Sequence, residues 1–413
     1  MNKQNLQTLK GFRDFLPTEK RKRDFVMAKI IEFFERFGFE PLETPTLEYA
    51  SLLLGKYGTE ADKLVYKFLD RGEREVALRY DQTVPTARIL AQYQNELPKY
   101  FRRYQIQNVF RADKPQKGRF REFTQCDIDI FGSNSPIADA EIIACAYFAY
   151  RNVGFDNIVI KINDRQVLFD TLTLFVTDQV TLFSIVQSID KLDKQSEEQV
   201  KNELVAKGLT EPNAFKVLTA IKAAQVSASL DQILACTKAL GVPDGSLVFN
   251  PTTARGLDYY TGMIFEVVIP GYSGGSVGGG GRYDNLIKQL SDIDIPAVGI
   301  GMGFDRMVEA ADELGVFNNL NYAKKIMVTV FSEQQLKYAL SITKKLRAEK
   351  FIAETCLAVG DLGKQLKIAS QKRMDFVIIA GENEQKEGTV TVKNLKTGEQ
   401  QNGKLEDLII LFK

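Results

Sequence analysis

The chain contains 413 residues, enough for about two to three domains. Hydrophobic residues make up 44% of it and charged residues 26%, an ordinary mixture for a globular protein. The 54 Lys and Arg residues balance 53 Asp and Glu residues to a net charge of +1, which excludes a uniformly basic nucleic-acid coat and an acidic disordered chain.

The sequence contains no histidine. Histidine metal sites, Ser-His-Asp triads, Cys-His dyads and imidazole acid–base catalysis are therefore excluded. An enzyme of this composition has to use arginine, lysine, carboxylates, tyrosine and backbone amides. Such groups suit reactions of polyanions, in which stabilising negative charge matters more than moving a proton.

Cysteine spacing and the lack of long apolar runs indicate the compartment. The four cysteines lie too far apart for a CxxC or zinc-ribbon spacing: Cys126, Cys145, Cys236 and Cys356. We therefore expect free thiols in a reducing environment. The first residues contain no apolar core of a secretory signal, and no run of about eighteen apolar residues occurs. These patterns predict a cytoplasmic protein that does not span a membrane.

The first part of the chain predicts a helix, a strand and a second helix. Apolar residues recur at steps of three and four over residues 20–37, which predicts an amphipathic helix that Gly38 ends. Residues 75–83, EVALRYDQT, predict a strand. Pro85 follows where the first turn of a helix would begin.

Residues 100–132 predict two strands joined by the polar loop ADKPQKGR. The period of two places apolar side chains on one face of the second strand, namely Cys126, Ile128 and Ile130. The other face carries an aromatic ring, an amide and two acids, namely Phe123, Gln125, Asp127 and Asp129. A solvated outer face would explain the acids, but not a phenylalanine in register with them.

The middle of the chain changes from helical to glycine-rich. Residues 166–226 contain no glycine before Gly208 and predict helices that could form an inserted module. The later run GGSVGGGG lacks the G-x-x-x-x-G-K-[ST] pattern of a phosphate loop. We expect its backbone instead to pack closely against a ligand or a neighbouring strand. The segment AVGIGMGFDRMVEAADELG predicts a strand that runs into a helix.

Residues 324–413 alternate between strand and helix patterns and predict a small α/β domain. They carry 16 Lys and Arg against 11 Asp and Glu, a net charge of +5. On charge alone, an ordinary solvated surface and a nucleic-acid-binding face explain this excess equally well.

Several arginines stand beside predicted turns and glycines. They are Arg111, Arg119, Arg121, Arg255 and Arg306. Arg306 falls in the first turn of a predicted helix, where the helix dipole also favours an anion. Together with a phenylalanine that can stack a base, these cations point to a nucleotide polyphosphate.

The order and the sequences of six segments resemble those of the histidyl-tRNA synthetase family of class II aminoacyl-tRNA synthetases. GFRDFLP resembles the family's N-terminal signature, GFEPLETPTLE its motif 1, FRADKPQKGRFREFTQ its motif 2 and GIGMGFDRM its motif 3. RGLDYYTG and GGGGRYDNL resemble the two histidine-specific motifs and are the most specific of the six.

The resemblance implies an α+β catalytic core, in which helices flank an antiparallel sheet of six strands. The core would comprise residues 1–165 and 227–320, with a helical insertion at residues 166–226. A C-terminal α/β domain, residues 324–413, would bind the anticodon. Motif 1 would form a homodimer interface.

The implied reaction is adenylation of histidine by ATP with Mg²⁺, followed by transfer of histidine to the 3′ end of tRNA(His). Arg111 and Arg255 would be catalytic, holding the α-phosphate. The residues implied to bind ATP are Arg111, Asp113, Arg119, Phe123 and Arg306. Within that set, Phe123 would stack the adenine, Asp113 would contact its edge and Arg306 would hold the γ-phosphate. No protein side chain is assigned to the metal.

A second set is implied to bind histidine: Asp81, Thr83, Gln125, Asp129, Tyr260 and Tyr283. The first three match positions that hold the α-amino group. Asp129 and Tyr260 would serve the two ring nitrogens, one usually a donor and the other an acceptor, and Tyr283 would line the pocket. Asp81 and Asp129 stand where many bacterial members carry glutamate, which shortens the acid and keeps its charge.

Three alternatives remain. The first is the histidine-binding regulatory paralogue of ATP phosphoribosyltransferase, which does not aminoacylate and usually lacks the anticodon domain. The second is a pseudo-synthetase domain that senses uncharged tRNA beside a kinase, although no kinase motif occurs here. The third is an unrelated α/β enzyme with coincidental motifs.

Overall fold

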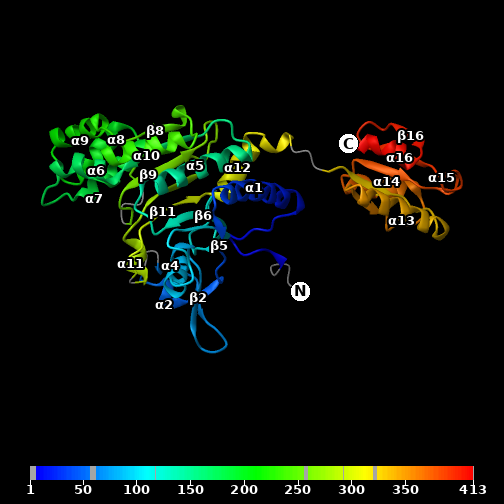
Figure 1. The fold of residues 1–413 in the computed structure, drawn as a ribbon, viewed down its shortest axis with the longest axis horizontal. Helices are drawn as coiled ribbons and strands as arrows, with labels where there is room; N and C mark the ends of the chain where they lie inside the picture. Colours follow the sequence, from blue (N-terminus) through cyan, green and yellow to red (C-terminus); the bar gives the residue numbers. More distant parts are fainter. Residues whose placement is uncertain are drawn as a thin grey trace. The chain divides into compact units, whose positions relative to one another are not determined.

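The computed structural model describes residues 6–55, 62–116, 118–254, 259–291, 293–319 and 323–412. The chain divides into two compact units, Met1–Asn318 and Asn319–Lys413 (Figure 1). Among the predicted site residues, Arg255 lies outside the described residues.

The first unit is built on an eight-stranded sheet. The strand order is β1-β5-β6-β11-β10-β9-β7-β8, and the six inner strands pair antiparallel throughout. The bounds, in that order, are Glu40–Pro41, Phe101–Phe110, Glu122–Phe131, Ala297–Met302, Gly278–Arg282, Met263–Val268, Val159–Asp164 and Leu247–Phe249. The expected six-stranded antiparallel sheet is thus present, and the short edge strands β1 and β8 extend it through parallel pairing.

Helices cover one face of this sheet. They are α1 (Pro17–Arg36), α5 (Pro136–Val153), α10 (Ala228–Ala239) and α12 (Phe304–Glu313), and Figure 1 shows α1, α5 and α12 lying close together. Their apolar stripes meet the predicted apolar face of β6, so that Cys126, Ile128 and Ile130 are buried in the main core. The predicted helix at residues 20–37 is confirmed. It begins earlier, at Pro17, because proline suits the first turn of a helix.

The opposite face of the sheet remains accessible near its centre. Two helices border it, α4 (Thr83–Gln92) and α11 (Leu286–Ser291). Four further helices share a second core with these two: α6 (Arg165–Leu172), α7 (Leu182–Ile189), α8 (Glu197–Ala206) and α9 (Glu211–Ala223). None of the helices in the described part of the chain is long and apolar enough to cross a membrane.

A small sheet lies beside α4, with strand order β2-β4-β3 (Leu47–Tyr49, Glu75–Leu78 and Lys67–Leu69). One side of it packs Ala77 against helix α2 (Ala50–Leu53). The strand predicted at residues 75–83 ends at Leu78, because the chain then turns into α4.

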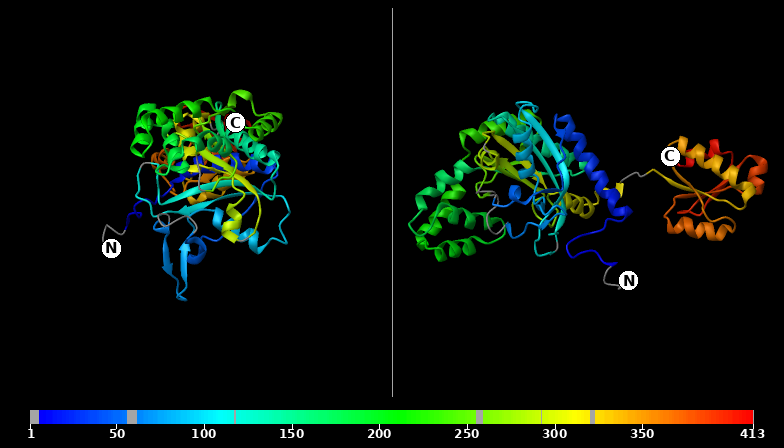
Figure 2. Two further views of the ribbon diagram at one scale, coloured as in Figure 1. Left: turned by 90° about the vertical axis from the view of Figure 1, so that its left-hand side faces the viewer. Right: turned by 90° about the horizontal axis from the view of Figure 1, so that it is seen from below.

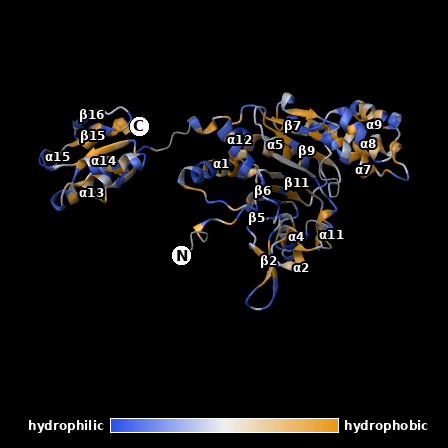
Figure 3. Cartoon of the chain, turned by 180° about the vertical axis from the view of Figure 1, so that it is seen from behind, coloured by the Kyte–Doolittle hydropathy of each residue, from blue (hydrophilic) through white to orange (hydrophobic). Residues whose placement is uncertain are grey.

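The second unit has a five-stranded sheet with order β13-β12-β14-β15-β16. The strands are Ile352–Thr355, Lys325–Val328, Phe376–Ile379, Val390–Asn394 and Gln400–Gly403; the helices are α13 (Glu333–Ala348), α14 (Leu362–Gln371), α15 (Glu382–Glu387) and α16 (Leu405–Leu408). Figure 2 shows helices on both sides of this sheet, and Figure 3 shows hydrophobic residues along its central strands. The predicted α/β alternation is confirmed.

Candidate active site

Two adjoining cavities open over the accessible face of the large sheet. Their volumes are about 510 Å³ and 680 Å³, and four residues line both: Tyr80, Arg111, Gln125 and Gly301. Gly301 is exposed although β11 is an inner strand, because both cavities reach its backbone. We call the smaller one the nucleotide cavity and the larger one the amino-acid cavity, after the ligands that the family resemblance implies for their residues.

Glycines in β10 and β11 make room for these cavities. A Cβ atom on Gly299 would lie 1.9 Å from Asp129 Oδ1, and one on Gly280 would lie 2.2 Å from the carbonyl oxygen of Gly299. Asp129 of β6 therefore rests directly against the backbone of β11, where any side chain at Gly299 would displace it. This confirms the expectation that the glycine-rich segment packs closely against its neighbour.

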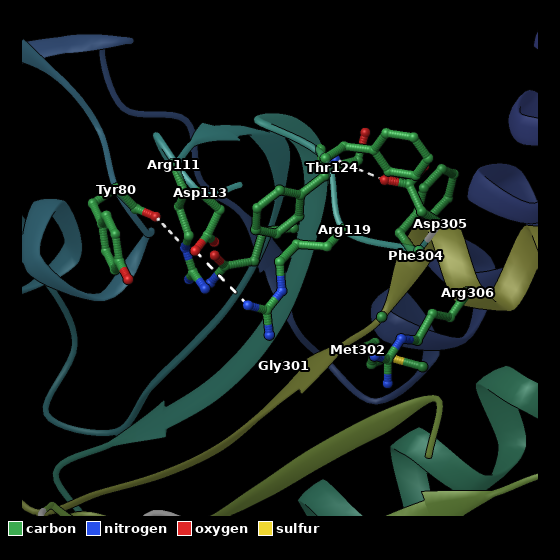
Figure 4. Close-up of a pocket in the computed structure, with 15 residues that line it drawn as sticks. Tyr80, Arg111, Asp113, Arg119, Thr124, Gly301, Met302, Phe304, Asp305 and Arg306 are labelled. Carbon is green, nitrogen blue, oxygen red and sulfur yellow. Dashed lines mark hydrogen bonds and ion pairs between the residues drawn. The ribbon is translucent and has the colours of Figure 1, made fainter. Parts of the chain in front are cut away.

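The nucleotide cavity collects all the described residues that were predicted to bind ATP. It is lined by Arg111, Asp113, Arg119, Phe123 and Arg306. Figure 4 shows Arg111 and Arg119 reaching it from one side and Arg306 from the other. The lining of the cavity thus includes three arginines and several aromatic rings, a combination that suits a polyphosphate joined to a base.

Arg111 is held at the junction of the two cavities. Its Nε donates a hydrogen bond to the carbonyl oxygen of Tyr80 at 3.1 Å, and its guanidinium lies 4.4 Å from the Tyr80 ring centroid and 5.2 Å from that of Phe123. Within the described ranges it forms no ion pair with a carboxylate. Its charge is therefore available to an anion from either cavity.

Arg306 is placed by the first turn of α12, as predicted from the sequence. Its Nη1 donates to the carbonyl oxygen of Ser276 at 2.8 Å. Arg119 approaches Asp113 more loosely, at 3.9 Å, and its side chain is largely exposed. Both arginines can therefore turn toward a bound polyanion at little cost.

A partly buried ion-pair network lies beside this cavity and was not predicted. Asp305 forms ion pairs with Arg23 of α1 and, at 3.2 Å, with Arg13. The Arg13 guanidinium lies 3.4 Å from the Phe120 ring centroid, and Arg23 donates to Thr124 at 2.8 Å. The N-terminal segment, the β5–β6 loop and α12 are thereby joined.

The amino-acid cavity brings together all six residues predicted to bind histidine. They are Asp81, Thr83, Gln125, Asp129, Tyr260 and Tyr283. Asp81 is fixed at the start of α4, where its Oδ1 accepts from the backbone N–H of Val84 at 3.2 Å. The Tyr283 hydroxyl donates to Asp129 Oδ1, which gives the deep end of the cavity a buried phenol–carboxylate pair.

Arg103 is a buried cation beneath the acids and was not predicted from the sequence. It is 1% exposed, lies opposite Asp129 in the β5–β6 register, and approaches Asp129 to 2.7 Å and Asp127 to 3.9 Å. The signal that could have revealed it is the same period of two, because positions 103 and 105 face the acids across the hairpin.

Burial controls the protonation of these acids. It raises the pKa of Asp129, and Arg103 and the Tyr283 hydroxyl oppose that rise. It raises the pKa of Asp127 to about 7, with Arg103 again opposing and Asp129 adding repulsion. Three carboxylates line this cavity, and two of them lie close to the single buried guanidinium of Arg103, so the cavity suits a ligand that carries positive charge.

The acids do not form a metal site by their arrangement. In the part of the chain that the structure describes, no group of three or more Cys, Asp or Glu side chains could hold a metal ion.

Comparisons with known proteins match both units of the chain. A family model described as Histidyl-tRNA synthetase matches residues 11–307, and one described as Anticodon binding domain matches residues 325–413. The histidine–tRNA ligase of Christiangramia forsetii is 38% identical over 95% of this chain and 96% of its own length. The histidine–tRNA ligase of Wolinella succinogenes is 36% identical over 95% of each chain.

A solved structure gives the same result for the fold. The crystal structure of histidyl-tRNA synthetase from a Nostoc species matches with a TM-score of 0.85 and 29% identity, covering 98% of this chain and 99% of that one. The first family model covers well over half of this chain, and the relatives match it over nearly its full length. The chain therefore belongs to the histidyl-tRNA synthetase family.

Proposed function

We propose that this chain is a histidine–tRNA ligase, which activates histidine with ATP and transfers it to the 3′ end of tRNA(His). The observation that carries the proposal is the position of Arg111. It stands where a cationic nucleotide cavity meets an acidic amino-acid cavity, within reach of both substrates. Adenylation has to occur at such a junction.

ATP fits the nucleotide cavity by chemistry. The Phe123 ring stacks the adenine, and Asp113 accepts a hydrogen bond from its edge. Arg119 lies near the ribose or phosphates, and Arg306 holds the γ-phosphate. Mg²⁺ accompanies ATP and is bound through phosphate oxygens, which are the ligands this hard cation prefers.

Histidine fits the amino-acid cavity with its α-ammonium beside Asp81, Thr83 and Gln125. Its ring reaches Asp129 and Tyr260, where a carboxylate accepts from one N–H and a phenol serves the other nitrogen. Tyr283 closes the pocket over Asp129. A pocket that hydrogen-bonds its substrate can discriminate against similar amino acids by a factor of roughly 10⁴–10⁵ without editing.

The reaction needs positioning and charge stabilisation and no imidazole. A carboxylate oxygen of histidine attacks the α-phosphorus, the new P–O bond forms, and pyrophosphate leaves with its electron pair. Arg111 and Arg255 neutralise the carboxylate and the α-phosphate, which would otherwise repel each other. The absence of histidine from the sequence is therefore compatible with this chemistry.

The remaining assignments concern assembly and partners. The exposed apolar side chains of the small sheet, Leu47, Tyr49, Phe68 and Leu69, support a homodimer interface at motif 1. The match of the second unit to anticodon-binding domains supports binding of the anticodon of tRNA(His), in the cytoplasm where tRNA is charged. Helices α6–α9 would form the helical insertion.

Histidine-dependent ATP–pyrophosphate exchange tests the proposal. The assay compares all twenty amino acids and includes Arg111→Ala and Arg255→Ala. We expect exchange with histidine alone and its loss in both variants. Histidine binding without exchange would favour the regulatory paralogue. A regulatory role, however, does not explain the nucleotide cavity or the second unit.

A further inference from the structure

Asp127 lies in the amino-acid cavity without an assigned role. It stands between Gln125 and Asp129 on the same face of β6, and it is 4% exposed. Gln125 lies at the junction with Arg111, whereas Asp129 lies at the deep end with Tyr283. Asp127 therefore faces the middle of the cavity, roughly 7 Å along the strand from either neighbour.

The two oxygens of Asp127 have different surroundings. Its Oδ2 accepts a hydrogen bond from Gln125 Nε2 at 2.6 Å and lies 3.9 Å from Arg103. Its Oδ1 has no hydrogen-bond donor among the described residues, and the same is true of Gln125 Oε1. Gly301 lies beside Oδ1, where even a methyl group would approach it to 3.4 Å. A buried acceptor without a donor is costly and points to a ligand that supplies one.

The order of the neighbours identifies the part of the ligand that Asp127 meets. Histidine carries its carboxylate at one end, its ring at the other and the α-ammonium between them. With the carboxylate at Arg111 and the ring at Asp129, the ammonium falls opposite Asp127. The hydrogen bond from Gln125 Nε2 also leaves Gln125 Oε1 as an acceptor toward the same point.

We propose that Asp127 is a further histidine-binding residue of this site, whose Oδ1 accepts a hydrogen bond from the α-ammonium group beside Asp81 and Gln125. This inference rests on the proposed function, because it takes histidine as the ligand. It places the carboxylates of Asp81 and Asp127, the amide oxygen of Gln125 and the hydroxyl of Thr83 around the ammonium group, which offers three N–H donors.

The test compares two ligands on the full chain. Calorimetry measures the affinity of histidine and of imidazolepropionate, which lacks the amino group, for the wild type, Asp127→Asn and Asp129→Asn. We expect Asp127→Asn to weaken histidine about 10- to 100-fold, as for a lost hydrogen bond to a charged group, and imidazolepropionate by less than about threefold. Asp129→Asn should weaken both ligands, because it acts on the ring.

Equal weakening of both ligands by Asp127→Asn, or no weakening of either, would overturn the inference. Asp127→Ser is measured in parallel and takes the place of Asp127→Asn if the asparagine variant unfolds at a lower temperature. Wild-type protein that neither binds histidine nor supports exchange would instead refute the proposed function. The two failures are therefore distinguishable.

Discussion

Removing the buried cation under the acidic cavity should destabilise the protein in a pH-dependent way. Arg103 lies 2.7 Å from Asp129 and 3.9 Å from Asp127, separations that correspond to attractions of about 6 and 4 kcal/mol at an effective dielectric constant of roughly 20. The cost of burying the charges offsets much of this. Arg103→Met should nevertheless lower the free energy of unfolding by about 3–5 kcal/mol at pH 8, because it leaves buried carboxylates uncompensated.

The loss should shrink at pH 5.5, since burial already raises the pKa of both acids and the variant lets them take up protons. Urea unfolding of the first unit, followed by circular dichroism at both pH values, measures this. Arg102→Met is the matched control, because Arg102 is half-buried, pairs with Glu141 at 3.0 Å and should cost below about 1 kcal/mol. Equal losses for the two variants, or no dependence on pH, would refute the reasoning.

Three further outcomes follow from the site. The folded-state pKa of Asp127, about 7, exceeds its ordinary value of 3.8. Its contribution to the free energy of unfolding is therefore greatest below pH 4 and is lost as the pH rises to 7. Asp127→Asn should flatten that decline when stability is measured by urea unfolding. Gly299→Ala should abolish histidine binding in calorimetry, whereas Gly245→Ala, with open space around it, should leave binding unchanged. Asp305→Asn should raise the KM for ATP about tenfold in pyrophosphate exchange and leave the KM for histidine within about twofold, because it loosens only the nucleotide cavity.

The side-chain period of two was enough to predict which face of β6 lines the cavities. Phe123, Gln125 and Asp129 reached the cavities, and Cys126 reached the core, because a strand leaves no other choice once one face is apolar. Arg306 was predictable for a similar reason, because a strand followed directly by a helix fixes which residues occupy the first turn.

Other features depend on how separate segments pair, which no single segment reveals. Arg103 follows a second arginine between aromatic residues, and only the register of β5 against β6 shows that it faces Asp129. The Asp305 network joins Arg13 and Arg23 to α12 across nearly three hundred residues of sequence, so no spacing rule could reveal it. The edge strand Glu40–Pro41 is too short to show a period.

The acidic face of β6 depends on a glycine of the neighbouring strand β11. An ordinary inner strand would place a side chain where Asp129 now lies, because the register sets Gly299 opposite Asp129 and a Cβ atom there would lie 1.9 Å from its Oδ1. Without a Cβ atom at Gly299, the Asp129 carboxylate can occupy the space above the neighbouring strand. Gly299 therefore allows this sheet to carry the buried carboxylate of Asp129. We expect a substitution at Gly299 to act on ligand binding as strongly as a substitution at Asp129.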